Sequence, residues 1–417
     1  MFFRHAHAAH PDWSVAVEEC LLLLGQQTTA RGFVREPNLG FVYLTDSLAP
    51  HADSVLSTLK ARTGISSWVG ASAAGICATG VEYMDEPALA VMLGQFAPGS
   101  FNVFSGTQRP PARAARTGTD QLAAWTALAH ADPHTPDVAS IVQDMSYKLA
   151  SGRLYGGVAS GRSNANQQPV QIADQVLRGG LSGVVFAQDV PVHTALAQGC
   201  FPLPTAREHT VTAAQEQSIV RLDEQRAFDA LIEDAGFHST APTDDVQPPT
   251  HAIDSTLRNA LHGLARQGLL VGLKNGPAAL DYLIRHVVAL DPDSGAVLTT
   301  TDIHPDQRVI FCTRDEGAAR QDLARVCRQL QGEAPVPIRG AVYISCLGRG
   351  GHLFGEQGEE LRLIQAELGA VPLVGFYANG EIYGRDLYGY SGVLMLFGAS
   401  RTPPPRTPTR TPTTSRS

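Results

Sequence analysis

The chain has 417 residues, of which 43% are hydrophobic and 17% charged, and its formal net charge is −8 at pH 7. That length exceeds one ordinary compact core, so two domains, or one domain with an internal duplication, are expected. The negative charge gives no general electrostatic reason to bind nucleic acid or an anionic membrane. Because there is no secretory signal or apolar run of about 20 residues, we expect a cytoplasmic protein without membrane insertion.

The first recognisable group of elements begins with a short apolar segment, GFVYLT, at residues 40–45, which predicts a strand. Residues 49–63 repeat apolar side chains at helical spacing. A second strand then runs into GASAAG at residues 70–75, and the apolar residues 87–96 predict a third. The predicted order is β-α-β-β.

A less regular copy of this order follows. Residues 138–144 are a strand candidate, and residues 147–152 form a helical or turn link. LYGGVASG, at residues 154–161, predicts the next strand. Residues 177–188 predict another strand, which is interrupted by glycines.

The third copy is the clearest. It comprises a strand at residues 340–350, a helix at 355–369 with apolar residues along one face, and strands at 371–384 and 388–398. Repetition of a unit is a strong architectural signal. We therefore predict an α/β fold of repeated β-α-β-β units, forming mixed sheets with flanking helices in two related halves.

Three segments are rich in turn-forming or low-complexity sequence. Proline and arginine at residues 107–118 predict an exposed loop, and residues 238–250 are a plausible domain boundary. The Pro/Thr/Arg-rich tail at residues 401–417 has nothing apolar to bury and is expected to be disordered.

One short motif, G-x-x-A-x-G, occurs three times, at residues 70–75, 156–161 and 375–380. A dinucleotide-binding loop needs a glycine where the first copy has Ser72, and no G-K-[ST] sequence exists for a phosphate loop. Small residues at a strand end also permit a tight bend and a close backbone approach. The motif therefore favours a structural bend over a nucleotide site.

The densest set of polar residues lies in the third copy. If its two central strands are neighbours, Cys346, Arg349, Asn379 and Glu381 could converge at one rim. An arginine recognises a carboxylate, and a glutamate receives an ammonium group, so together they would suit a zwitterion such as an amino acid. The alternative is a salt bridge between Arg349 and Glu381 that closes the rim.

Catalytic and metal-binding patterns are weak. Cys346 could be a nucleophile, but the nearby His352 has no evident orienting partner, so a buried, inert cysteine is favoured. The six cysteines include no C-x-x-C pair, which fits reduced thiols. His5, His7 and His10 lack a nearby carboxylate or cysteine cluster and are expected at the surface. We expect no metal and no cofactor.

The sequence resembles the FIST proteins, which combine a FIST N-terminal and a FIST C-terminal domain. The resemblance rests on WVGASAAGI with a downstream Glu82, on LYGGVASG and SCLGRG, and on VPLVGFYANGEI and YGYSGVLMLF. It implies an N-terminal helical lead-in at 1–29, a FIST N-terminal domain at 30–222 and a FIST C-terminal domain at 223–400.

The resemblance implies a small-molecule-binding sensory module of intracellular signal transduction, with amino acids as the favoured ligand class. We expect no separate output domain, so a signal would pass to a signalling protein partner by direct interaction. Two alternatives are a cysteine-dependent enzyme using Cys346 and a protein-interaction scaffold using the tail and the loop at 109–116. The candidate ligand-binding residues are Cys346, Arg349, Gly350, Tyr377, Asn379, Glu381, Ser72 and Ser160.

Overall fold

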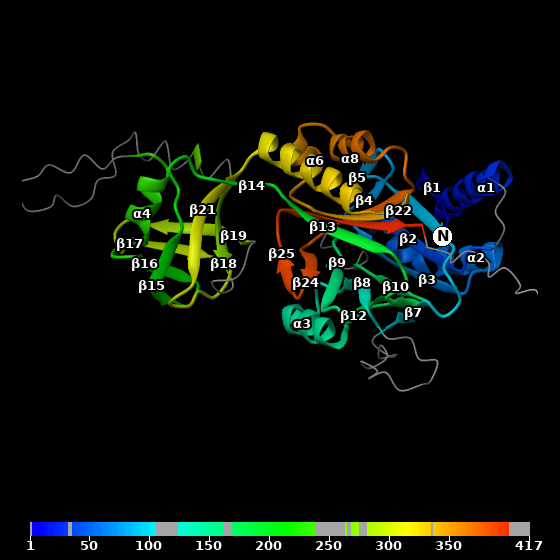
Figure 1. The fold of residues 1–417 in the computed structure, drawn as a ribbon, viewed down its shortest axis with the longest axis horizontal. Helices are drawn as coiled ribbons and strands as arrows, with labels where there is room; N and C mark the ends of the chain where they lie inside the picture. The colour runs from blue at the N-terminus through cyan, green and yellow to red at the C-terminus, as the bar shows by residue number, and fades with distance from the viewer. Residues whose placement is uncertain are drawn as a thin grey trace, which may run out of the picture.

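The computed structural model describes residues 2–31, 36–105, 124–161, 168–237, 263–264, 268–274, 282–334 and 337–399. The expected exposed loop at 107–118, the boundary at 238–250 and the tail at 401–417 lie outside these residues. In the described part, a larger body of three sheets with helices on its outside stands beside a smaller β domain (Figure 1).

Each of the three sheets in the larger body has six strands. The first sheet runs, in spatial order, through β1 (Phe3–Ala9), β6 (Ala88–Gly94), β2 (Leu39–Thr45), β3 (Ser67–Ala73), β10 (Gln171–Ala173) and β11 (Val176–Leu177). The second runs through β7 (Phe101–Phe104), β12 (Leu181–Phe186), β8 (Thr126–Ala131), β9 (Arg153–Val158), β24 (Glu381–Gly384) and β25 (Asp386–Tyr388). The third runs through β13 (Val192–Gln198), β26 (Ser391–Gly398), β22 (Ile338–Cys346), β23 (Leu373–Ala378), β4 (Gly75–Ala78) and β5 (Val81–Met84).

The three sheets share one arrangement. A central parallel pair, β2 with β3, β8 with β9 or β22 with β23, is flanked by antiparallel strands. The last two strands of each sheet form a hairpin that comes from another unit of the chain. The first unit gives β4 and β5 to the third sheet, the third gives β24 and β25 to the second, and the second gives β10 and β11 to the first. This exchange ties the three units into a closed ring.

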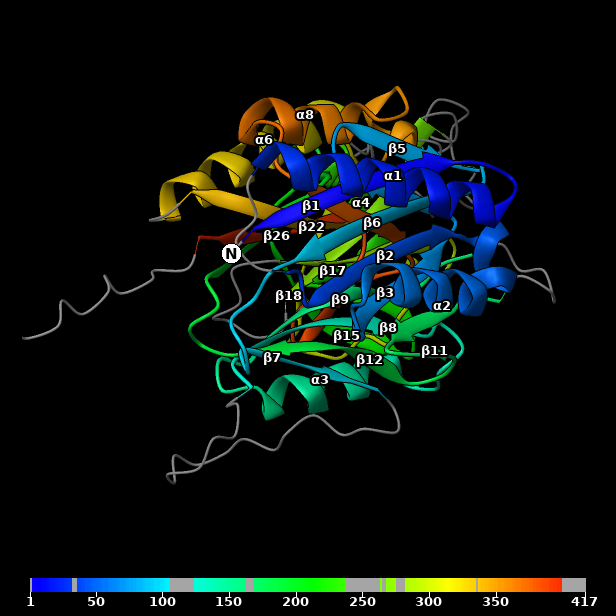
Figure 2. The same ribbon diagram turned by 90° about the vertical axis from the view of Figure 1, so that its right-hand side faces the viewer.

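Helices cover the outer faces of the sheets, as Figure 2 shows. The first sheet carries α1 (Trp13–Arg31), the 3-10 helix η1 (Asp46–His51) and α2 (Ala52–Thr63). The second carries α3 (Val138–Lys148), and the third carries α6 (Glu316–Glu333), α7 (Gly351–Phe354) and α8 (Glu359–Leu368). The inner faces pack into one apolar core. At its centre Tyr43 stacks on Phe376 and shares a 3.0 Å hydrogen bond with Nε2 of His130, and burial lowers the pKa of His130 to about 3.

The first glycine of each G-x-x-A-x-G motif lies against the neighbouring parallel strand. A Cβ added at Gly70, Gly156 or Gly375 would lie 1.7, 1.8 or 1.6 Å from a backbone oxygen of that strand. Only glycine allows this approach. The expected tight bend is also present, because β3 ends at Ala73 in the first sheet and β4 begins at Gly75 in the third.

The smaller body, called here the inserted β domain, lies between β13 and α6 in the chain and is seen at the left of Figure 1. Its main sheet runs through β14 (Cys200–Pro202), β21 (Arg308–Arg314), β15 (His209–Gln215), β16 (Ser218–Leu222), β20 (Ala296–Thr299), β19 (Leu283–Asp291) and β18 (Leu269–Lys274). The short strand β17 (Gln225–Arg226) pairs with β16, and α4 (Ala227–Asp234) follows it.

The predicted α/β class with mixed sheets and flanking helices is confirmed. The strand predicted at residues 138–144 is wrong, because these residues belong to helix α3. The Asp137 side chain caps that helix by accepting a hydrogen bond from the backbone of Ser140, and the buried Val142 and Met145 share one helix face. The helical lead-in at 1–29 holds strand β1 as well as helix α1.

Candidate functional site

The loop after β22 carries the predicted Arg349, whose guanidinium is fully buried. Its Nε donates to Oε1 of Glu360, on α8, at 2.8 Å, and both side chains have an exposed fraction of 0%. The hydroxyl of Tyr343 donates to the same oxygen at 2.6 Å, and Ser345 Oγ donates to Oε2 at 3.0 Å. Burial alone would lower the pKa of Arg349, but the Glu360 carboxylate raises it. The backbone of Gly350 also donates to Oε2 of Glu360, so four residues of β22 and the following loop contact this one carboxylate.

Gly350 is required because two side chains occupy the space beside it. A Cβ at Gly350, which has a φ of +56°, would lie 2.7 Å from Oε1 of Glu82 and 3.0 Å from the ring of Tyr377. Glu82 comes from β5 of the first unit and accepts hydrogen bonds from the backbone of Gly358 at 2.9 Å and of Gly351 at 3.3 Å. The hairpin of the first unit therefore supports the polar loop of the third.

The alternative considered from the sequence, a salt bridge between Arg349 and Glu381, is not formed, because Nε of Arg349 pairs with Glu360 instead. Arg349 also donates a 3.4 Å hydrogen bond from Nη1 to the backbone oxygen of Tyr390, and its guanidinium lies 5.2 Å from the ring centroid of Phe354. Its Nη2 is buried and has no hydrogen-bond partner among the described residues. One signal pointed to Glu360: it stands four residues before Ile364, so it occupies the buried stripe of α8 that also holds Leu361 and Leu368.

Glu381, in β24, is buried beside the end of β22. Its Oε2 accepts hydrogen bonds from Oγ of Ser391 at 2.7 Å and from the backbone of Ser391 at 3.1 Å. Its Oε1 has no hydrogen-bond partner among the described residues. Burial raises the pKa of Glu381 to about 8, although hydrogen bonds from Ser391 and the charge of Arg349 oppose the shift. The Glu381 carboxyl therefore holds its proton for most of the time at pH 7.

Cys346 ends β22 beside Glu381, and each of the two groups shifts the pKa of the other. Burial and the Glu381 carboxylate raise the pKa of Cys346, so the thiol form is favoured at neutral pH. A catalytic cysteine needs a stabilised thiolate, and this surrounding does the opposite. The geometry thus favours the inert interpretation of Cys346 over a nucleophile.

Tyr390 connects this region to the inserted β domain. Its backbone has a positive φ of 56°, which is uncommon for a residue other than glycine. Its hydroxyl hydrogen-bonds with His286 of β19, and the Arg314 guanidinium lies 5.3 Å from its ring centroid. A Cβ at Gly348 would lie 2.7 Å from the Tyr390 ring, which therefore covers the loop after Cys346.

The other predicted site residues are not gathered around Glu381. Ser160 donates a 2.5 Å hydrogen bond to the backbone oxygen of Tyr377, and Ser72 accepts one at 2.9 Å from the backbone of Val170. Both serines are buried and hold the bends between sheets. Asn379 is exposed in the turn between β23 and β24.

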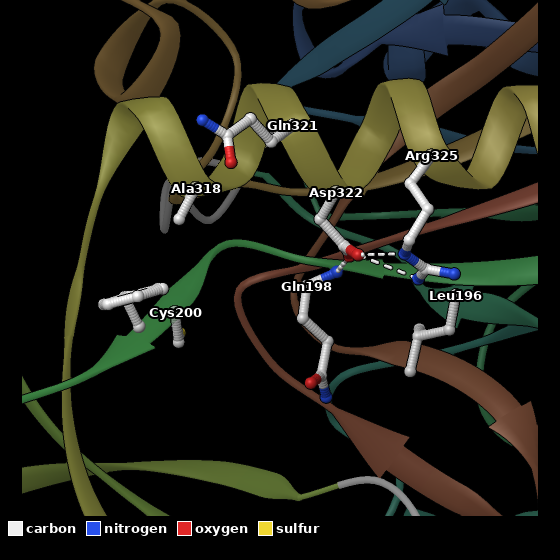
Figure 3. A pocket seen from close by; sticks show the side chains of 8 residues that line it. Leu196, Gln198, Cys200, Ala318, Gln321, Asp322 and Arg325 are labelled. Atoms are coloured by element: carbon white, nitrogen blue, oxygen red, sulfur yellow. Dashed lines mark hydrogen bonds and ion pairs between the residues drawn. The ribbon is translucent and has the colours of Figure 1, made fainter. Parts of the chain in front are cut away.

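A cavity of about 370 Å³ lies between α6 and the strands β13 and β14 (Figure 3). Asp322 of α6 accepts a 2.7 Å hydrogen bond from the backbone of Gln198 and pairs with Arg325 at 2.8 Å. No sequence pattern predicts this cavity, because the inserted β domain separates its two walls in the chain. Its lining includes Leu196, Gln198, Cys200, Ala318, Asp322 and Arg325.

These features define an α/β protein whose larger body contains three linked sheets. A buried polar loop of this body lies next to the inserted β domain, which consists mostly of strands. The chain belongs to the FIST family: the FIST N domain matches residues 38–225 and the FIST C domain matches residues 252–384. FIST domains are generally a sensory, ligand-binding family. The gap between the two matches falls within the inserted β domain.

Two mycobacterial proteins are similar to this chain over most of its length. An uncharacterized protein of Mycobacterium tuberculosis (strain H37Rv) is 28% identical over 382 residues, covering 87% of this chain and 91% of the relative. An uncharacterized protein of Mycobacterium bovis is 28% identical over 371 residues, covering 87% and 90%. In the described part of the chain, no helix has the length and apolar character needed to cross a membrane.

Proposed function

We propose that this protein is a sensory module of intracellular signal transduction that binds a small zwitterionic metabolite of the amino acid class. The supporting observation is a pair of buried atoms of opposite character, Nη2 of Arg349 and Oε1 of Glu381, neither of which has a hydrogen-bond partner among the described residues. A ligand with one carboxylate and one ammonium group would complete both.

Energetics favour such a ligand. Leaving a buried polar atom without a partner costs about 1–3 kcal/mol, and more when the group is charged. Arg349 and Glu381 both act on Cys346: the Glu381 carboxylate raises the pKa of that thiol, and the Arg349 guanidinium lowers it. The two groups therefore lie within electrostatic range of the Cys346 thiol, and a compact zwitterion bound beside that thiol would meet both. Tyr390 would have to move to admit it, because its ring covers the Gly348 loop.

Ligand binding on this scheme is linked to a proton. The Glu381 carboxyl has a pKa of about 8 and is mostly protonated at pH 7, whereas an ammonium group needs the carboxylate. Binding should therefore release a proton, and affinity should rise by up to about tenfold per pH unit below pH 8.

The test is isothermal titration calorimetry of the full chain with each common amino acid, at pH 6 and pH 8. Glu381→Gln keeps the side-chain shape and removes the charge, so we expect at least about tenfold weaker binding without the pH dependence. Glu356→Gln is the control, because Glu356 is 82% exposed in the same unit. If no amino acid binds, or if Glu381→Gln binds like the parent at both pH values, the proposed site is wrong.

The scaffold alternative depends on the tail and the loop at 109–116, both of which lie outside the described residues. It stays a prediction. A pull-down that is unchanged when residues 401–417 are deleted would remove the tail from it.

A further inference from the structure

Two cysteines far apart in the sequence lie on adjacent strands where the inserted β domain joins the larger body. Strands β14 and β21 pair antiparallel, with Cys200 opposite Arg314 and Pro202 opposite Cys312. Cys200 and Cys312 are thus two positions apart on adjacent strands, and side chains two positions apart share a face of the sheet. Both are free thiols.

The two thiols differ in access. Cys312 is only 3% exposed and packs with Leu270 and Ile284 in a small apolar cluster. Cys200 packs against that cluster, but it is partly exposed and lines the cavity of about 370 Å³ shown in Figure 3. A small molecule in the cavity would therefore reach the thiol of Cys200 before that of Cys312.

The two thiols also influence each other's environment, because Cys200 packs against the small cluster that holds Cys312. The pKa of Cys312 is raised well above its usual value, and the largest cause is a hydrogen bond with Cys200, followed by burial. Diagonal neighbours on adjacent antiparallel strands lie about 7–8 Å apart, slightly beyond the usual Cα separation in a disulfide. A small shift of the two strands would therefore be needed to bring the sulfur atoms to bonding distance.

We propose that Cys200 and Cys312 are a redox-active thiol pair that a low-molecular-weight disulfide entering the cavity oxidises to an intramolecular disulfide. Cys200, as its thiolate, attacks one sulfur of the small disulfide, whose S–S bond breaks and releases one small thiol. Cys312 then attacks the Cys200 sulfur of the mixed disulfide and releases the second small thiol. Two protein thiols are oxidised, one small disulfide is reduced, and the two thiol protons end on the two released thiols.

The first step prepares the second. Two of the causes that raise the pKa of Cys312 are the hydrogen bond and the negative charge of Cys200 itself. Both disappear once Cys200 carries a mixed disulfide. Burial then remains, opposed by a backbone hydrogen bond from Gly272. The Cys312 thiolate becomes easier to form only after Cys200 has reacted, which orders the two steps.

The other cysteines lack this combination. Burial is the main cause that raises the pKa of Cys20 and of Cys327 to about 12, and it also raises the pKa of Cys77 and Cys346. None of these four lines the cavity.

The bond would link the two chain connections of the inserted β domain, since β14 follows β13 and β21 precedes α6. Gly199, beside Cys200, donates a 3.2 Å hydrogen bond to the backbone oxygen of Tyr390 and lies next to Nη1 of Arg349. Oxidation would thus cross-link these two connections one residue away from the proposed ligand site. It does not depend on that site binding a ligand.

The test treats the reduced full chain with oxidised glutathione and maps disulfides by mass spectrometry of a non-reduced digest. We expect one linked pair of peptides, joining Cys200 to Cys312. Cys312→Ser should stop at a stable glutathione mixed disulfide on Cys200, and Cys200→Ser should leave Cys312 unmodified. Cys327→Ser and Cys346→Ser are the controls and should keep the link.

Three results would overturn the proposal: no reaction at Cys200, a stable mixed disulfide on Cys200 of the parent, or a link that involves another cysteine. The parent digest decides the matter even if a variant is poorly folded. Circular dichroism checks the fold of each variant, and Cys312→Ala replaces Cys312→Ser if the serine variant does not fold.

Discussion

Replacing Glu360 with glutamine should strongly destabilise the third unit. The amide keeps the side-chain shape but removes the charge that pairs with the fully buried Arg349 at 2.8 Å. Removing one partner of a buried ion pair costs about 3–5 kcal/mol, because the other charge is left unpaired in a medium of low polarity. The hydroxyl of Tyr343, at 2.6 Å, would also lose a charged acceptor. We therefore expect Glu360→Gln to lower the unfolding free energy by about 3–5 kcal/mol.

Urea unfolding alone does not report on the third unit separately, because a protein with two bodies need not unfold in one step. Native-state hydrogen exchange of the backbone amides of β22 and β23 reports on the third sheet directly. The matched control is Glu316→Gln, which removes the ion pair of Arg320 with a glutamate that is 52% exposed. Exposed pairs contribute about 0–1 kcal/mol, so this variant should change the protection of β22 and β23 little.

A Glu360→Gln variant whose protection falls by no more than that of the control would refute the reasoning. The double variant Arg349→Met with Glu360→Leu gives a second check. Replacing both charges by apolar groups of similar volume is often nearly neutral, so the double variant should recover most of the lost stability. If the double variant is as unstable as Glu360→Gln, packing rather than charge governs the loop.

Two further predictions concern other parts of the fold. Gly375→Ala should lower the unfolding free energy by more than about 4 kcal/mol, because its Cβ would lie 1.6 Å from a backbone oxygen of β22. The control is Gly25→Ala in α1, which has open space around it and should raise the melting temperature slightly. Equal melting temperatures would contradict this. Burial opposes protonation of His209, but hydrogen bonds to Asp234 and Asp223 outweigh it and raise the His209 pKa. The stability that this imidazolium provides is complete below the unfolded pKa of about 6.5 and is lost as the pH rises through the raised folded pKa. The difference in unfolding free energy between the parent and His209→Gln should therefore shrink from pH 6 to pH 9. A constant difference in urea unfolding would refute the prediction.

Much of the fold follows from apolar runs and the repeated glycine motif. The strands predicted at 40–45, 154–161 and 371–384 correspond to β2, β9 and β23 with β24. Strand β8, whose sequence is TALAHA, was not predicted, because alanine has a low strand propensity. The exchanged hairpins were not predicted either. Their strands have only two to four residues, and their partners belong to other units, so no local pattern marks them.

Only the part of the site that lies at the ends of neighbouring strands could be predicted from the sequence. Cys346 pairs with Ala378 in the parallel register, three residues before Glu381, so the proximity of Cys346 and Glu381 follows from two neighbouring strands that end together. The partner of Arg349 does not follow, because the choice between Glu360 and Glu381 depends on how α8 packs on the sheet. The contact of Cys200 with Cys312 needs the pairing of β14 with β21, across about a hundred residues of the inserted β domain.

The three units share an arrangement, but the loops at the ends of their central strands make different contacts, and this difference supports the proposal that the function lies in the third unit. After β8, the buried Asp132 accepts hydrogen bonds from the backbone of Gly179 at 2.6 Å and of His134 at 2.7 Å, so its carboxylate is used by its own unit. After β22, the Arg349 loop instead depends on Glu82 of the first unit, and Glu381 reaches the second sheet. A movement of this loop would therefore act on the third sheet, on a hairpin of the first unit and, through Glu381, on the second sheet, whereas a movement at Asp132 need not. That makes the third unit the place from which an event at Glu381 can spread through the larger body, and through Tyr390 to the inserted β domain.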